Sequence, residues 1–313
     1  MRFEGLDLNL LVALEVLLEC RSTTETARRL HLSQPTISAA LSRLRLYFND
    51  ELLMNVGREM VPTAMGEELA PAITELLNVA RFRIIQAEGF DPATSHRRFR
   101  ILTSDYTYDV LLADTLAIAA RQAPHVTFEL LQTGPEGARL FQKGEVDVMI
   151  TVPNYVLPDH PSLSLFSDED AVICWSEGKY AAGIDQEQFL MADCAIAVFG
   201  EERRPTISDL HFRKHNIALN CQVEVSSFSA LPGAVCGTDR IAVMHSRHAR
   251  FFQRAYPLAC HPLPVSGTEV REIAQWHTLR RKDQGIRWLL DLLQVQARTG
   301  PSADSDTPLG TSQ

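Results

Sequence analysis

Residues 32–45 read LSQPTISAALSRLR and carry amide, hydroxyl and guanidinium groups but no acidic side chain. The Ser-Gln-Pro start is typical of a helix N-terminus, because serine caps a helix and proline fits its first turn. Ile37, Leu41 and Leu44 would share one face of this helix and hold it to a core. The other face would offer hydrogen-bonding groups and positive charge, which suit the base edges and phosphates of duplex DNA.

Two shorter helices are expected before this segment. Asp7 is expected to cap the first, and Ser22-Thr-Thr-Glu25 forms an S/T-x-x-E capping box that starts the second. A tight turn at His31-Leu32 would join the second helix to the third. This arrangement predicts a helix-turn-helix, whose last helix enters a major groove about 12 Å wide.

Ten residues are candidate contacts with double-stranded DNA. Gln34 can form two hydrogen bonds with adenine, and Pro35 and Thr36 can touch a thymine methyl group. The arginines are candidates for phosphate contacts, which supply much of the affinity. The full set is Arg28, Arg29, Ser33, Gln34, Pro35, Thr36, Ser38, Ser42, Arg43 and Arg58. From these residues alone, a three-helix bundle that binds another protein is the alternative.

The overall charge does not by itself indicate nucleic-acid binding. The chain has 313 residues and a formal net charge of −9, and residues 1–90 contain nine arginines, no lysine and twelve acidic residues. A DNA-binding surface must therefore be local. The N-terminus is not a convincing signal peptide, and no stretch approaches the roughly 18–20 apolar residues of a membrane span. We therefore expect a cytoplasmic location and no membrane association.

Neither a metal site nor an enzyme motif is evident. The six cysteines are scattered without a C-x-x-C pair, and His211 and His215 have no third ligand nearby, so we expect no metal and no cofactor. The motifs G-x-S-x-G, G-x-x-x-x-G-K-[ST] and H-E-x-x-H are absent, and no G-x-G-x-x-G follows a strand. We therefore expect no enzymatic activity.

The rest of the chain predicts a hairpin, a linker helix and two α/β lobes. Residues 51–62 are expected to form the hairpin. The helix from about Thr63 to Glu88 has apolar residues at a spacing near 3.5, and its length and its place between two different segments favour pairing with another chain. A single helix packed on its own domain is the alternative. From Arg98, apolar β-branched runs alternate with helical patterns, which predicts parallel α/β sheets. The strands divide near residues 165–170, and the last helix could return to the first lobe. The polar tail after residue 300 is expected to be disordered.

A ligand is expected where two predicted helices begin. Thr103, Ser104 and Asp105 follow one strand, and Ser226, Ser227 and Phe228 follow another. In open α/β lobes, ligands bind at the carboxyl ends of strands, where helix N-termini present free N–H groups. Four further candidates of this kind are Val152, Pro153, Phe199 and His245. Simple helix capping is the alternative explanation for the serines.

The first 65 or so residues resemble a known family. The run DLNLLVALEVLLE, then STTETARRLHLSQPTISAALSRLRLYFNDELL, then GREMVPTAMG is similar to the N-terminal domain of LysR-type transcriptional regulators. The segments MRFEGLDLNLLVAL, SRLRLYFND and VGREMVPT resemble the branch of nodulation regulators (NodD). The resemblance continues to about residue 300 through ILTSDYTYDVLL, EVDVMI and VEVSSFSALPGAVCGTDRIAVMH.

This resemblance implies a fold class and a division of the chain. It implies a multidomain α+β protein with a winged helix-turn-helix at residues 1–63, a linker and dimerisation helix at 64–90, and a periplasmic-binding-protein-like effector domain at 91–300. Lobe I would comprise about 97–168 and 268–298, lobe II about 169–267, and the tail 301–313. Leu53-Met54-Asn55 and Arg45 depart from the general family pattern but suit the NodD-like branch, and they leave Arg58 as the one expected wing contact.

The resemblance also implies partners. These are promoter DNA, RNA polymerase, a small aromatic inducer such as a flavonoid, and a homotetramer built from dimers. A regulator of aromatic catabolism that responds to a salicylate-like acid is the alternative. Activation is expected, with repression also within the family's range.

Overall fold

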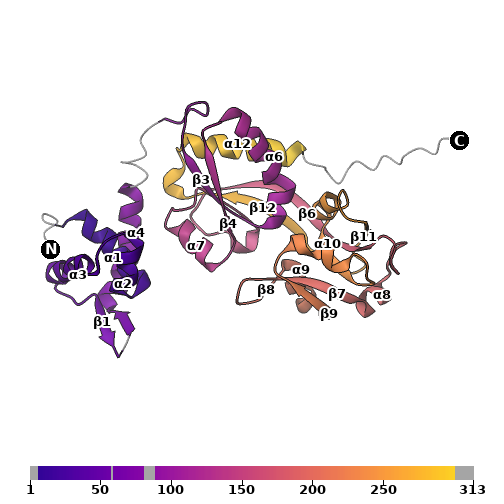
Figure 1. The fold of residues 1–313 in the computed structure, drawn as a ribbon, viewed down its shortest axis with the longest axis horizontal. Coiled ribbons are helices and arrows are strands. Elements are labelled where there is room, and N and C mark those ends of the chain that lie inside the picture. Colours follow the sequence, from indigo (N-terminus) through magenta and orange to yellow (C-terminus); the bar gives the residue numbers. More distant parts are fainter. Residues whose placement is uncertain (1–5, 58, 81–88, 300–313) are drawn as a thin grey trace. The chain divides into compact units, whose positions relative to one another are not determined.

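The computed structural model describes residues 6–57, 59–80 and 89–299. The chain divides into two units, residues 1–88 and 89–313 (Figure 1). Three expectations lie outside the described residues: the wing contact Arg58, the last part of the linker helix at 81–88, and the disordered tail at 301–313. None of the described helices is long and apolar enough to cross a membrane.

The first unit begins with the three expected helices. Asp7, Ser22 and Ser33 each accept a hydrogen bond from a backbone N–H in the first turn, which confirms them as N-caps. Asn49, in the left-handed conformation, ends the third helix. The elements are α1 (Leu8–Cys20), α2 (Thr23–Arg29), α3 (Gln34–Phe48), β1 (Leu53–Val56), β2 (Glu59–Pro62) and α4 (Ala64–Val79).

The linker helix α4 packs partly against its own unit. Ile73 and Leu77 are buried in the same core as Leu14, Ile37 and Leu44. On a different flank of α4, Ala72 and Leu76 are exposed. The apolar residues of this helix therefore lie on two surfaces. One packs into the unit's own core, and the other is exposed.

The second unit contains the predicted alternation of strands and helices, together with elements that the sequence analysis missed, among them β11, β12 and α11. The elements of its first part are β3 (Arg98–Thr103), α5 (Asp105–Thr107), η2 (Tyr108–Leu112), α6 (Ala113–Gln122), β4 (Thr127–Gln132), α7 (Pro135–Gln142), β5 (Val148–Thr151), η3 (Pro153–Tyr155) and β6 (Ser162–Trp175). The middle elements are α8 (Gln186–Met191), β7 (Asp193–Phe199), β8 (Arg204–Pro205), α9 (Ile207–Lys214), β9 (Asn220–Val225), η4 (Phe228–Ala230) and α10 (Leu231–Val235). The last are β10 (Ile241–His245), α11 (Ser246–Phe252), β11 (Leu258–Pro262), β12 (Glu269–Gln275), η5 (Thr278–Arg280) and α12 (Gln284–Thr299).

Each lobe contains the predicted parallel strands, but antiparallel strands that the sequence did not predict complete the sheets. In lobe I, β4, β3 and β5 are parallel, and in lobe II, β10, β7 and β9 are parallel. Strand β6 pairs antiparallel with β12 over residues 162–169, and then with β10 and β11 over residues 170–175. One strand therefore belongs to both lobes and fixes their connection.

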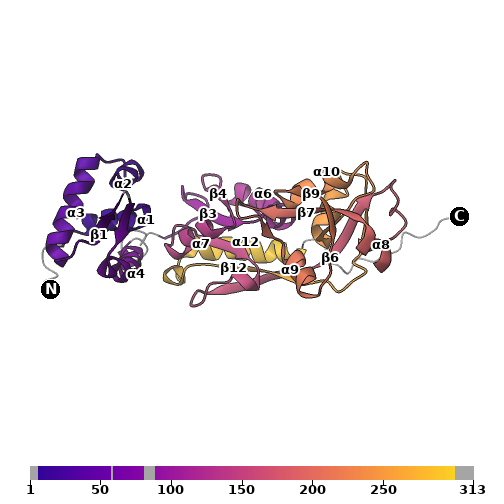
Figure 2. The same ribbon diagram turned by 90° about the horizontal axis from the view of Figure 1, so that it is seen from below.

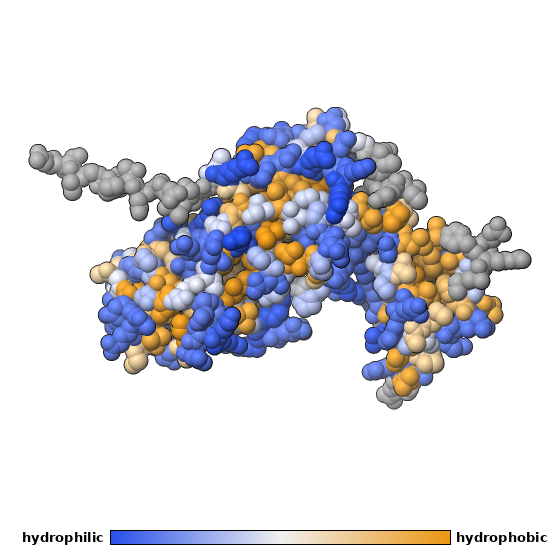
Figure 3. Space-filling view, turned by 180° about the vertical axis from the view of Figure 1, so that it is seen from behind, coloured by the Kyte–Doolittle hydropathy of each residue, from blue (hydrophilic) through white to orange (hydrophobic). Residues whose placement is uncertain are grey.

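Helices cover both faces of the lobe I sheet. Helices α6 and α12 lie side by side on one face (Figures 1 and 2), and Ile101 packs with α12 in that core. The next residue, Leu102, points to the other face and packs against Phe141 of α7. In the view of Figure 3, hydrophilic residues cover much of this unit, with hydrophobic patches between them.

A buried ion-pair network ties the start of α12 to lobe I. Asp147 accepts hydrogen bonds from Arg97 at 2.7 Å and from Arg280, and Arg97 also binds Asp283 at 2.6 Å. Because these charges are largely removed from water, each needs its partners. The last helix thus returns to the first lobe, as its sequence suggested.

Candidate functional site

The polar side of α3 faces solvent. Ile37, Leu41 and Leu44 are buried, whereas the polar residues predicted to face DNA lie on the exposed side. The exposed set is Ser33, Gln34, Pro35, Thr36, Ser38, Ser42 and Arg43. This helix therefore presents hydroxyl, amide and guanidinium groups on one accessible surface.

Within this set, Ser33 caps the N-terminus of α3. Its Oγ accepts a hydrogen bond from the Thr36 backbone N–H at 3.3 Å and lies 2.7 Å from Thr36 Oγ1. Gln34 Nε2 donates to Thr23 Oγ1 at 3.3 Å, which links α3 to the start of α2. Gln34 is exposed and remains accessible to a base edge.

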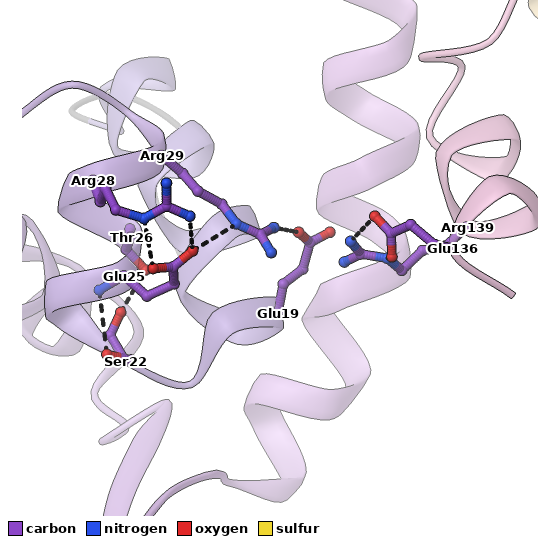
Figure 4. A network of polar contacts seen from close by, with 8 residues as sticks. All are labelled: Glu19, Ser22, Glu25, Thr26, Arg28, Arg29, Glu136 and Arg139. Carbon is purple, nitrogen blue, oxygen red and sulfur yellow. Dashed lines mark hydrogen bonds and ion pairs between the residues drawn. The ribbon is translucent and has the colours of Figure 1, made fainter. Parts of the chain in front are cut away.

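Two of the predicted phosphate contacts, Arg28 and Arg29, are paired with acidic side chains (Figure 4). Glu25 accepts from Arg28 at 2.6 and 2.9 Å and from Arg29 at 3.4 Å, and Arg29 also binds Glu19 at 3.2 Å. The Arg28 hydrogen bond is the main reason that the pKa of Glu25 falls to about 2. Only one of the two predicted capping-box interactions is therefore present among the described residues. Ser22 Oγ accepts from the Glu25 N–H, whereas the Glu25 side chain binds arginines.

The other arginines of this unit differ in role. Arg43 is 60% exposed in its side chain, and its guanidinium lies 3.9 Å from the Asp7 carboxylate. Arg45 donates to the backbone oxygens of Glu51 at 2.8 Å and Leu53 at 2.6 Å. Arg45 thus ties the recognition helix to the hairpin. The sequence alone did not indicate these contacts.

A cavity of about 540 Å³ lies between the two lobes of the second unit. Five of the ten predicted ligand contacts line it: Ser104, Val152, Phe199, Phe228 and His245. The other five, Thr103, Asp105, Pro153, Ser226 and Ser227, do not.

Asp105 and Ser104 show why some residues at the predicted helix starts line the cavity and others do not. The Asp105 carboxylate accepts hydrogen bonds from the Ser229 N–H at 2.8 Å and Oγ at 2.9 Å, so it joins the lobes beside the cavity. Ser104 lines the cavity but also caps α5, because its Oγ accepts from the Thr107 N–H at 3.1 Å. Capping and cavity lining therefore coincide at Ser104.

Most of the cavity wall is apolar, and much of it was missed by the sequence analysis. The added lining residues include Leu102, Tyr106, Met149, Ile150, Tyr155, Leu157, Arg204, Ile207, Val270 and Glu272. Val270 and Glu272 belong to β12, a strand that had not been recognised. An apolar wall with a few polar groups is typical of small-molecule sites.

The polar groups gather around His245. Its Nδ1 lies 3.1 Å from Asp170 Oδ1, and its ring lies 4.6 Å from that of Tyr106. The Tyr106 hydroxyl donates to Asp168 at 2.7 Å. Burial lowers the pKa of His245, but the hydrogen bond and charge of Asp170 outweigh this effect and raise it above its ordinary value. Asp170 therefore favours the protonated imidazole.

Glu272 is a buried acid in the same group. Its pKa is raised to about 7, mainly by burial and also by the charge of Asp168. The charge of His245 and a Thr107 hydrogen bond partly oppose this rise. Within the described residues, no group of three or more His, Cys, Asp or Glu side chains could hold a metal ion. This arrangement can bind an aromatic molecule and hydrogen-bond its polar substituents.

The raised pKa of Glu272 predicts a pH-dependent stability. Folding strengthens proton binding at a group whose pKa moves from 4.5 to about 7, so the free energy of unfolding falls as pH rises through this interval. Glu272→Gln removes this contribution. Its free energy of unfolding relative to the unmodified chain should therefore grow by about 2–3 kcal/mol between pH 5 and pH 8.

Urea unfolding of both chains at several pH values measures this difference. Glu269→Gln is the matched control, because its side chain is 54% exposed on the same strand and should give a pH-independent difference. A Glu272→Gln difference that also stays constant with pH would contradict the raised pKa.

Known protein families match both units of the chain. Residues 8–67 match the model of the bacterial regulatory helix-turn-helix protein, lysR family, and residues 92–298 match the LysR substrate binding domain. Nodulation protein D 3 of Rhizobium leguminosarum bv. phaseoli is 39% identical over 302 residues, which cover 96% of this chain and 100% of the relative.

Two solved structures share the fold. A probable transcriptional regulator from Pseudomonas aeruginosa is 25% identical with a TM-score of 0.62, over 93% of this chain and 97% of its own. Full-length CbnR complexed with its target DNA is 15% identical with a TM-score of 0.57, over 94% and 99%. With both family models matched along most of its length, the chain belongs to the LysR family of bacterial transcription regulators.

Proposed function

We propose that this regulator is a ligand-responsive activator that senses a small aromatic inducer such as a flavonoid. The observation that carries the proposal is the combination, in one chain, of an exposed recognition helix and an apolar cavity with a polar end between two lobes. The relatives named nodulation protein D support a role in nodulation. The protein would work in the cytoplasm, on promoter DNA and together with RNA polymerase.

The chain would divide as follows. Residues 1–63 bind DNA, residues 64–90 form the linker, and residues 91–300 bind the effector. Lobe I comprises about 97–168 and 268–298, and lobe II about 169–267. The crossing of β6 at residues 169–170 and the start of β12 at Glu269 support these lobe limits.

A salicylate-like acid is the less favoured alternative inducer. Arg204 is the observation in its favour, because it lines the cavity and its guanidinium could pair with a carboxylate. That guanidinium already donates to the Thr133 backbone oxygen at 3.3 Å.

The recognition helix yields a test of DNA binding. Gln34→Ala should relax the base preference at one position of each half-site, with a loss of discrimination of about 1–3 kcal/mol. Arg43→Ala should weaken binding to all sequences about equally and lower the salt slope by about 1, because it removes a phosphate contact. Fluorescence anisotropy on the operator and on single-base-pair variants, at several salt concentrations, measures both.

Arg98→Ala is the matched control for this titration. Arg98 is 64% exposed and paired with Glu129 in the effector domain, so its removal should leave DNA affinity unchanged. A uniform loss of affinity for Gln34→Ala would refute the base-reading role.

We further propose that α4 pairs two chains, and that two such dimers form a tetramer. The exposed Ala72 and Leu76 supply an apolar stripe that the unit's own core leaves uncovered.

Leu76→Glu should therefore weaken the dimer, because it would bury an unpaired charge in the interface. We expect the dissociation constant to rise by a factor of about 30 or more, or about 2 kcal/mol. Sedimentation over a concentration series measures it. Glu67→Gln changes the net charge by the same amount, with opposite sign, on another flank of α4 and should have no effect. An unchanged Leu76→Glu dimer would place the interface elsewhere.

A further inference from the structure

Glu272 occupies a buried strand position, where an apolar residue is usual. Along β12, the buried residues on its face are Val270, Glu272 and Ala274. Glu272 pairs with Phe166 of β6, and the three residues after it pair with both β5 and β6, so this part of the strand lies inside the sheet. The residue is only 4% exposed. A charged side chain at such a position destabilises the fold unless it gains partners.

One oxygen of this carboxyl group has no protein partner. Within the described residues, Glu272 Oε2 is buried without a hydrogen bond. The neighbouring His245 is also incompletely bonded, because Asp170 engages its Nδ1 and its Nε2 has no hydrogen-bond partner among the described residues. Both residues line the cavity. An acceptor and a donor are therefore available at the same end of it.

The charges around this end disfavour a second carboxylate. Asp168 and Asp170 are both buried beside the His245–Glu272 pair. The His245 ring is engaged by Asp170, and Arg247 donates its backbone N–H to Asp168 while its guanidinium lies 4.5 Å from the Phe166 ring. Above the pKa of Glu272, which is about 7, an anion would be repelled by three carboxyl groups, whereas an uncharged hydroxyl group would not.

The remainder of the cavity suits an aromatic ring system. Phe199 and Phe228 lie with ring centroids 4.9 Å apart, and Phe228 lies 5.6 Å from the His245 ring. The cavity volume of about 540 Å³ is in the usual range for small-molecule sites, roughly 300–1,000 Å³. Aromatic side chains next to one polar end would orient a flat ligand with its substituent toward His245 and Glu272.

We propose that Glu272 determines ligand specificity: its carboxyl group accepts a hydrogen bond from a hydroxyl group of an uncharged aromatic ligand and excludes aromatic carboxylates. His245 donates to the same hydroxyl oxygen through Nε2. This inference rests on the proposed function, because it assigns a ligand class to the effector cavity. It decides between the two inducer classes in favour of the neutral phenolic one.

Calorimetric titration of the full chain with matched probes tests this assignment without any variant. Monohydroxyflavones are compared with unsubstituted flavone, and salicyl alcohol with salicylate. At about pH 8, where Glu272 is mostly ionised, at least one monohydroxyflavone should bind about 10–100-fold more tightly than flavone, because a hydrogen bond to a buried charged group is lost without the hydroxyl. Salicyl alcohol should bind more tightly than salicylate. Equal binding of flavone and every hydroxyflavone, or tighter binding of salicylate, would overturn the inference.

Two variants then locate the effect at Glu272. Glu272→Leu should abolish the preference for the hydroxyl group, and Glu272→Gln should improve salicylate binding about 10-fold or more. Glu269→Leu, on the same strand but exposed, should keep both preferences. Preferences that persist in Glu272→Leu, with folding verified by circular dichroism, would assign them to another residue and overturn the inference.

Failure of the proposed function would look different from failure of this inference. If no probe binds and none alters DNA binding, the ligand-responsive function itself fails, and the specificity of Glu272 fails with it. If flavones bind but without preference for a hydroxyl group, only the assignment of Glu272 fails.

Discussion

Strand β6 belongs to both lobes of the effector domain, and the candidate ligand site depends on this shared strand. Its first half pairs with β12 and its second half with β10 and β11. Asp168 and Asp170, at the crossing, hold Tyr106 of lobe I and His245 of lobe II by hydrogen bonds. The polar end of the cavity is thus built where the lobes are joined, so a ligand there contacts the groups that set their relative placement.

A second joint between the lobes lies close by. Ser229 Oγ donates to Asp105 at 2.9 Å and to Asp109 at 3.0 Å, and His248 Nε2 lies 2.9 Å from Asp109. Lobe placement therefore depends on two small polar clusters. A ligand shifts such an equilibrium only by its difference in affinity between the two arrangements. The Oε2 atom of Glu272, bonded to ligand in one arrangement and without a protein partner in the other, would supply such a difference.

The sequence predicted those features of the fold and the site that depend on residues close together in the chain. The recognition helix, its Ser33 cap and its buried leucines follow from short-range spacing, and the structure has them as predicted. The role of Arg45 depends on hairpin carbonyls that no local pattern marks. Asp105 was expected in the cavity because it starts a helix, but Ser229, 124 residues away, binds its carboxylate. Glu272 was missed for a related reason: EVREIAQ reads as a polar segment until β5 and β6 pair with it.

The central claim is that one chain couples aromatic ligand binding to operator binding. DNase I footprinting of the full chain on the DNA upstream of its own gene, with and without hydroxyflavones and hydroxybenzoates, tests it most directly. We expect a long, two-part footprint over several helical turns, as two paired DNA-binding domains require, and a change in its extent with a hydroxyflavone. A footprint unchanged by every compound would contradict the coupling, and no footprint at low salt would contradict the DNA-binding role given to α3.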